Sequence, residues 1–185
     1  NTLLALERAV DFTKVERLLD VGGGDGTMAI ALRNKYPDLQ ITIFNLPQVV
    51  ELIHQNLLAA SAWDRISPLP GDFRKDELPK GNDMVMFSRV LADWPPELCR
   101  ELLQKAHRAL IPDGTLVICE PFEDGNMPLV VAFEQGYLPY DDFGANLSKP
   151  LARYLELLAE TGFKVLSLHP RQADSVHGVI IAQRV

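Results

Sequence analysis

The chain has little cysteine and no long hydrophobic run. Its 185 residues include two cysteines, Cys99 and Cys119, too few for a disulfide framework or a zinc site, which favours a reducing, cytoplasmic location. No segment approaches the ~20 apolar residues of a membrane-spanning helix. No charged start followed by an apolar stretch indicates a signal peptide either. We therefore expect neither a membrane partner nor a metal site.

Basic residues are also scarce. The chain has 18 Lys and Arg against 25 Asp and Glu, for a net charge of −7. This balance argues against a nucleic-acid partner, because phosphate binding needs clustered positive charge. The 47% hydrophobic and 23% charged residues are typical of one globular domain spanning residues 1–185. Because the chain begins with Asn1 rather than Met, we expect it to be a C-terminal fragment of a longer protein.

Apolar, β-branched runs alternate with segments of helical period, which is typical of a parallel α/β sheet. Residues 123–147 lack a clean period and are expected to form a functional or poorly ordered loop. The last two apolar runs predict a terminal hairpin. The expected strands are Arg17–Val21, Ile41–Asn45, Ile66–Leu69, Asp83–Ser88, Thr115–Cys119, Lys164–Leu168 and Gly178–Ala182. The expected helices lie between the first two strands, from Pro47, from Pro95 and over Leu151–Thr161, and Pro112–Gly114 is an expected turn.

The most informative segment is the glycine-rich stretch Asp20–Thr27, placed between a strand and a helix. Glycines there let the backbone turn sharply and approach a ligand closely. The dinucleotide fingerprint G-x-G-x-x-G would need a third glycine where Thr27 stands. The carboxylates of Asp20 and Asp25 would oppose a pyrophosphate and suit a cationic ligand, such as the sulfonium and ammonium of S-adenosylmethionine. These features disfavour a nicotinamide oxidoreductase; the remaining alternative is a turn that holds no ligand.

Six short motifs, taken together with their order and spacing, resemble a known family. They are Leu18–Gly26, Phe44–Pro47, Gly71–Phe73, Leu91–Trp94, Pro112–Gly114 and Glu120–Pro121. The chain resembles the class I S-adenosylmethionine-dependent methyltransferases from Leu18 to about Phe163. Within them it is similar to the two-domain small-molecule O-methyltransferases of the plant caffeate type and the bacterial hydroxyneurosporene type.

The resemblance implies a fold, a reaction and an assembly. The fold is a Rossmann-like, seven-stranded, mostly parallel sheet with helices on both faces and an antiparallel C-terminal hairpin. The reaction transfers a methyl group from S-adenosylmethionine to a hydroxyl of a small, largely apolar metabolite, leaving S-adenosylhomocysteine. Relatives carry an N-terminal helical domain that dimerises, so the longer protein is expected to be a homodimer. Asn1–Val10 matches the linker helix, and the dimerisation domain is expected to be absent.

The cofactor contacts follow partly from chemistry and partly from the resemblance. Asn45, at the end of the second strand, can accept from one ribose hydroxyl and donate to the other, or it can simply form a turn. Asp72 can accept from the adenine amino group while Phe73 covers the ring, or both can belong to a surface turn. The expected cofactor-binding residues are Asp20, Gly22, Gly24, Gly26, Asn45, Leu46, Asp72, Phe73, Ser88 and Trp94. Trp94 can equally be a core tryptophan, and Ser88 or Arg89 replaces a lysine of the family.

The catalytic pattern of the plant-type relatives is broken. Their general base is a histidine before Asp-Trp, where this chain has Ala92, which cannot take a proton. The remaining candidates for acid–base roles are Glu120 and Asp93, which alternatively contact the loop backbone and cap the next helix, respectively. Tyr137 and Tyr140 are also available. The alternative function is therefore a protein that binds the cofactor without turnover.

None of the chain's histidines restores the missing base. His54, His107, His169 and His177 lie away from the expected pocket and are expected to be solvated or structural. A second acidic residue that relatives place near Ser148 is not evident either.

Overall fold

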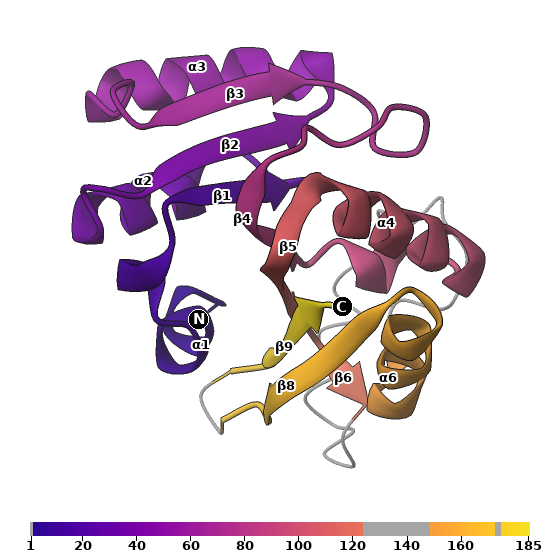
Figure 1. Cartoon of the computed structure of the whole chain (residues 1–185). Coiled ribbons are helices and arrows are strands. Elements are labelled where there is room, and N and C mark those ends of the chain that lie inside the picture. The colour runs from indigo at the N-terminus through magenta and orange to yellow at the C-terminus, as the bar shows by residue number, and fades with distance from the viewer. Residues whose placement is uncertain (1, 124–148, 173–174) are drawn as a thin grey trace.

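The computed structural model describes residues 2–123, 149–172 and 175–185. Tyr137, Tyr140 and Ser148 lie outside them. The described part forms a seven-stranded sheet in the order β3-β2-β1-β4-β5-β9-β8, shown in Figure 1. Its strands are β1 (Arg17–Val21), β2 (Gln40–Asn45), β3 (Ile66–Pro70), β4 (Asn82–Ser88), β5 (Leu110–Glu120), β8 (Phe163–His169) and β9 (Gly178–Arg184).

The sheet is parallel from β3 to β5 and antiparallel at its C-terminal end. β9 pairs antiparallel with β5 and with β8, so the last two strands form the expected hairpin. The bounds of β1 are those expected, and the other strand bounds lie within two residues of the expected ones, except at the start of β5. The predicted fold class is confirmed.

Helices cover both faces of the sheet. Buried residues of α1 (Thr2–Ala9), α2 (Thr27–Lys35) and α3 (Pro47–Ala60) belong to one hydrophobic core, and those of α4 (Pro96–Ala109) and α6 (Leu151–Glu160) to the other. Strand residues alternate between the two cores, because successive side chains point to opposite faces. In β4, Met84 and Met86 face the first core, whereas Val85 and Phe87 face the second.

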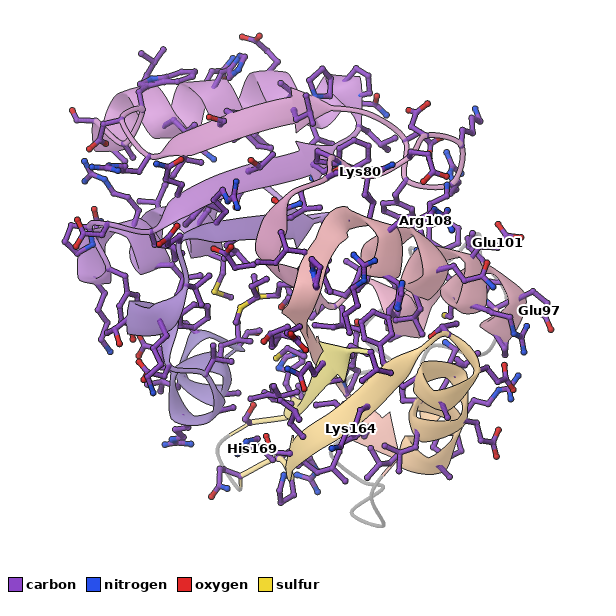
Figure 2. The ribbon with its side chains drawn as sticks, in the orientation of Figure 1. Lys80, Glu97, Glu101, Arg108, Lys164 and His169 are labelled. Carbon is purple, nitrogen blue, oxygen red and sulfur yellow. The ribbon has the colours of Figure 1, made fainter. Side chains whose placement is uncertain are left out.

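The two faces of α4 differ in burial, which is why the sequence predicted this helix. Its inner face buries Leu102, Leu103 and Ala106, whereas Glu97 and Glu101 project outward from the molecule in Figure 2. This arrangement gives the i, i+3, i+4 pattern of an amphipathic helix. Of the residues that the structure describes, none belongs to a helix long and apolar enough to cross a membrane.

Two local features differ from the expectations. The expected turn at Pro112–Gly114 lies inside β5: Asn82 pairs with Leu110 but Met84 pairs with Thr115, so β5 carries extra residues there. A short parallel pair, β6 (Phe122–Glu123) with β7 (Lys149–Pro150), was not expected. Two 3₁₀ turns, η1 (Phe12–Lys14) and η2 (Leu91–Asp93), complete the described elements.

The topology indicates where a ligand would bind. The parallel strands β1 to β5 all end at the same edge of the sheet, and the strand order reverses between β1 and β4. Ligands of open α/β sheets bind at such a switch point, beyond the carboxyl ends of the strands. The glycine-rich turn follows β1 at this point, and the segment holding Ala92 follows β4.

Candidate functional site

A cavity of about 490 Å³ opens beside the glycine-rich turn. Four elements line it: α1 with Thr2 and Leu3, the turn with Asp20 and residues 22–25, α2 with Thr27, Met28 and Ala31, and the end of β4 with Ser88 and Arg89. The cavity therefore contains the predicted residues Asp20, Gly22, Gly24 and Ser88.

The glycines of the turn have two different surroundings: one leaves space at the cavity wall, and another packs closely against neighbouring side chains. Gly24 has a φ of +56°, and a Cβ there would have nothing within 4 Å, so this position is open to a ligand. Gly22 has a φ of +73°, and a Cβ there would lie 2.9 Å from Val90 Cγ2 and 3.7 Å from Phe73 Cε1. The segments after β3 and after β4 thus meet at the glycine turn.

Asp20 is a buried carboxylate without a partner. Its residue is 1% exposed, and neither carboxylate oxygen has a hydrogen-bond partner in the described part of the chain. Burial raises the pKa of Asp20 to about 7. A Cβ on Gly23 would overlap its Oδ2, so the glycine turn is what allows this carboxylate to stand at the cavity. Such a group is costly unless something pairs with it.

The side chain of Asn45 holds the glycine turn. Its Nδ2 donates to the Gly24 carbonyl at 3.1 Å, and its Oδ1 accepts from the Leu46 amide at 2.8 Å. These contacts match the turn-forming alternative for Asn45. The predicted ribose contacts of Asn45 and Leu46 stay a prediction, and neither residue lines the cavity.

Asp72, Phe73 and Trp94 lie together but outside the cavity wall. The Asp72 carboxylate accepts from Arg74 Nε and Nη2 at 2.9 and 2.8 Å, and these bonds lower its pKa to about 2. Phe73 packs edge-on against Trp94 with ring centroids 5.8 Å apart. Arg74 lies over the same indole at 5.7 Å. The cluster ties the segment after β3 to the one after β4.

Glu120 contacts the loop backbone. Its Oε1 accepts from the amides of Val90 and Leu91, both at 2.8 Å, while Oε2 has no partner in the described residues. The residue is fully buried, and burial raises its pKa to about 8. This is the non-catalytic alternative named above for Glu120. Its acid–base role stays a prediction, as does that of the half-buried Asp93 in η2.

Eight lining residues were not among the predicted contacts: Thr2, Leu3, Gly23, Asp25, Thr27, Met28, Ala31 and Arg89. Arg89 follows the end of β4 with a φ of +57°, in the region that non-glycine residues seldom adopt. Its place directly after the expected strand was the one signal available. Thr2 and Leu3 reach the site only because α1 packs against the sheet, and local sequence carries no signal of that. Predicted Gly26 caps α2 with a φ of +85° rather than lining the cavity.

The histidines have structural contacts or lie outside the cavity wall. The ring of His54 packs against Trp63 and that of His107 against Phe163, and His169 hydrogen-bonds with Ser167. Across the described ranges, no cluster of three or more His, Cys, Asp or Glu residues is arranged to hold a metal ion.

Comparison with known proteins decides the family. The sequence profile of the O-methyltransferase domain matches residues 3–134. The chain belongs to this family. The match begins in α1 and includes β1 to β5, the glycine turn, Ala92 and Glu120, so the cavity lies within the family domain.

Curated relatives agree with this assignment. The chain is 33% identical over 183 residues to the L-tyrosine C(3)-methyltransferase of Streptomyces lavendulae, covering 97% of this chain and 50% of the relative. It is 33% identical over 184 residues to the 3-hydroxy-5-methyl-1-naphthoate 3-O-methyltransferase of Streptomyces sahachiroi, covering 97% and 53%. The chain thus spans about half the length of these relatives.

A solved structure shows the same fold. The S-adenosylmethionine-dependent methyltransferase SibL superposes with a TM-score of 0.88 at 31% identity, covering 98% of this chain and 54% of that one. The agreement extends over both cores and the terminal hairpin, as the resemblance implied.

We predict that Gly24→Val lowers the affinity for S-adenosylhomocysteine by at least about tenfold, because its side chain would enter the open wall of the cavity. Gly81→Val is the matched control: Gly81 also has a positive φ, +91°, and a Cβ there has only Arg17 nearby, at 3.9 Å. Both variants should lose roughly 1–2 kcal/mol of stability to the left-handed backbone. Calorimetry beside urea unfolding tests this, and equal affinity in the two variants would contradict it.

We predict that Asp20→Asn weakens S-adenosylhomocysteine binding and stabilises the ligand-free protein at pH 8. Burial raises the pKa of Asp20 from its ordinary value of 3.8 to about 7 in the fold, so the fold binds more protons than the unfolded chain between these values. Wild-type stability therefore falls as pH rises from about 4 to 7, by up to roughly 1.4 kcal/mol per pH unit. Asparagine removes this loss, so its advantage should grow with pH.

Urea unfolding of both proteins at pH 5 and pH 8 measures the effect. Asp25→Asn is the control of opposite sign, because a hydrogen bond from the Thr27 amide lowers the pKa of Asp25. That carboxylate contributes its stability above its unfolded pKa, so Asp25→Asn should destabilise the fold about equally at pH 5 and pH 8. An advantage of Asp20→Asn that is the same at both pH values would refute the burial of a charged, unpaired Asp20.

Proposed function

We propose that this chain binds S-adenosylmethionine and transfers its methyl group to a hydroxyl of a small, largely apolar molecule. The observation that carries the proposal is Asp20, a buried carboxylate without a partner in the described residues, at the cavity beside the glycine turn. A cationic ligand group supplies the missing partner. Membership of the O-methyltransferase family supports the reaction class.

The cavity fits the two charges of the amino-acid end of this cofactor. Its ammonium suits Asp20, and its carboxylate suits the guanidinium of Arg89 across the same cavity. The open face at Gly24 leaves space for the aliphatic chain between them. For the adenosine end, the predicted contacts of Asn45, Leu46, Asp72, Phe73, Ser88 and Trp94 remain part of the proposal.

The chain's own contribution to the reaction is positioning. Bound S-adenosylmethionine supplies a methyl group on a sulfonium, ready for in-line attack. The segment after β4 holds the acceptor oxygen in line with that methyl, a contribution worth up to ~7–11 kcal/mol in well-oriented reactions. The acceptor's hydroxyl proton must leave as the O–C bond forms. Ala92 cannot take it, so Glu120, Asp93 or solvent receives it, at a typical gain of ~10²–10⁴-fold for a positioned base.

The relatives indicate which acceptors to try first. Two of them are named for L-tyrosine and for a hydroxynaphthoate, which are both hydroxylated aromatic acids. The name of the former gives a carbon atom, C(3), as the methylated atom, and that of the latter gives an oxygen. Losing a phenolic proton activates the oxygen and also ring carbons, because the phenolate charge is shared between the oxygen and the ring. The assay must therefore identify the methylated atom.

The test has two stages. Calorimetry compares S-adenosylhomocysteine with NAD; binding of the former alone supports the proposal, and binding of NAD alone overturns it. Methyl transfer is then measured for the protein as the cell makes it, with isotopically labelled cofactor and a panel of phenolic and isoprenoid alcohols. Product NMR locates the methyl group. Tight cofactor binding without product across the panel would instead support a binding protein without turnover.

Assembly and location complete the proposal. We expect the whole protein to be a homodimer through a segment that precedes this chain, and to reside in the cytoplasm. Both cysteines are buried free thiols, as a reducing compartment requires. Light scattering of the whole protein and cell fractionation test these two points.

We predict that Asp72→Ala lowers the affinity for S-adenosylhomocysteine roughly ten- to a hundredfold, as expected for a lost hydrogen bond to a charged group. S-inosylhomocysteine lacks the adenine amino group and should bind both proteins almost equally. Arg74→Met is the control, because it removes the ion pair with Asp72 and keeps the carboxylate. Equal weakening of both ligands would show that Asp72 acts on the loop rather than on the base.

We predict that Glu120→Gln lowers kcat by roughly ten- to a hundredfold if the carboxylate takes part in proton transfer. The amide oxygen of glutamine can still accept from Val90 and Leu91, so the fold and the cofactor affinity should be kept. Steady-state kinetics with calorimetry measure both. An unchanged kcat would remove Glu120 from proton transfer and leave it a purely structural role.

A further inference from the structure

Two lysines are buried beneath the site, one under each of its two loops. Lys105 of α4 is 8% exposed and Lys149 of β7 is 4% exposed. Lysine is almost never buried to this degree without partners. Burying an ammonium group costs free energy unless hydrogen bonds offset it, so two such lysines call for a role beyond filling space.

Both ammonium groups bind backbone carbonyls. Lys105 Nζ donates to the Phe73 carbonyl at 2.7 Å and to the Asp76 carbonyl at 2.9 Å. It therefore bridges two backbone carbonyls of the segment after β3. Within this segment, residues 71–76, the Asp76 carboxylate also accepts from the Asp72 amide at 2.8 Å. We call residues 71–76 the adenosine-side loop, after the contacts proposed for Asp72 and Phe73.

Lys149 binds the segment after β4 in the same way. Its Nζ donates to the Leu91 carbonyl at 2.9 Å and to the Ala92 carbonyl at 3.0 Å. Cys99 Sγ donates to the same Leu91 carbonyl at 3.2 Å. Glu120 holds the amides of the same stretch, so residues 90–93 are fixed by a carboxylate on their N–H groups and by an ammonium on their carbonyls. We call residues 90–93 the acceptor-side segment, after Ala92.

Both loops contact the glycine turn, but each is hydrogen-bonded to a different lysine. A Cβ on Gly22 would meet Val90 of the acceptor-side segment and Phe73 of the adenosine-side loop. Each loop has its own lysine, from a different element. Ring contacts of Phe73 and Arg74 with Trp94 couple the two loops. Hydrogen bonds to a charged group are stronger than such ring contacts, so each lysine has its larger effect on the loop that it binds.

We propose that Lys105 and Lys149 are positioning residues that separately adjust the two halves of the reaction site, Lys105 for cofactor binding and Lys149 for the methyl acceptor. The inference rests on the proposed function and deepens it. Neither lysine needs to touch a ligand. Each acts through the carbonyls that it binds, and a displacement of ~1 Å in such a segment can cost on the order of a hundredfold in rate.

The experiment compares Lys105→Met and Lys149→Met, which keep the length of the side chain and remove its charge. Lys164→Met is the matched control, because Lys164 is an exposed lysine on β8, labelled in Figure 2, away from the cavity. Lys105→Arg and Lys149→Gln retain donors and serve as rescue variants, and they also keep the test valid if a methionine variant does not fold. Circular dichroism and thermal unfolding establish the fold of each.

The two methionine variants are expected to change different parameters, cofactor affinity for Lys105→Met and use of the acceptor for Lys149→Met. Lys105→Met should weaken S-adenosylhomocysteine binding and raise the KM for S-adenosylmethionine by about tenfold or more, with kcat within about threefold. Lys149→Met should leave cofactor affinity within about threefold and lower kcat/KM for the best phenol of the panel by about tenfold or more. Amide exchange should quicken in residues 71–78 for the former and in residues 89–95 for the latter. Donor-retaining variants should recover part of each loss.

Several outcomes overturn the inference. Equal losses of binding and turnover in both variants, in step with lost thermal stability, would make the lysines merely structural. Unchanged parameters in both would show that the loops hold their positions unaided. A wild-type protein that binds no S-adenosylhomocysteine would overturn the proposed function, and this inference with it. A protein that binds the cofactor but methylates no phenol retains the test through the cofactor affinities and the exchange rates of the two segments.

Discussion

The burial of Asp20 is the constraint on which the site depends. A parallel sheet that reverses its order between β1 and β4 brings the end of β1 to the middle of the molecule, where a carboxylate is shielded from water. Burial without a partner raises the pKa of Asp20 to about 7, which is a cost to the ligand-free fold. Proteins tolerate such a cost at functional sites, where a ligand offsets it. The glycines of the turn belong to the same constraint, since a side chain at Gly23 would displace the carboxylate.

The two loops that adjoin the glycine turn are fixed from the core rather than from the surface. Phe73 and Val90 reach Gly22 from two loops, and each loop is bound below by buried polar groups: Lys105 for the first, and Glu120 with Lys149 for the second. Buried polar contacts specify one backbone position more sharply than apolar contacts do, because a shift leaves a polar group unsatisfied. The cavity itself lies between α1, the glycine turn, α2 and the end of β4, and the two loops reach this site through their contacts at Gly22.

Sequence alone predicted the fold well, because the relevant signals are local. Alternating apolar strands, helical period and the Gly22–Gly26 turn each act within a few residues, and β1 was placed to the residue. The start of β5 was missed because Pro112–Gly114 has the sequence of a turn but lies within the strand as an irregularity in its pairing with β4. Lys105 and Lys149 could not be found this way: they contact carbonyls 29–58 positions away, and a lysine in an amphipathic helix ordinarily predicts a solvated face.

The absence of a histidine at Ala92 has a structural counterpart. Where a histidine would project, the chain has a small buried side chain, and the polar groups around it are already engaged with the backbone: Glu120 with two amides and Lys149 with two carbonyls. Because the Glu120 side chain holds the loop, it cannot move toward a substrate to accept a proton. Burial raises its pKa to about 8, so only the fraction that is ionised near neutral pH can accept a proton, and Oε2 carries no bond within the described chain. Under the proposed function, orientation therefore contributes most of the rate, and any proton transfer to Glu120 uses the outer oxygen of a fixed carboxyl group.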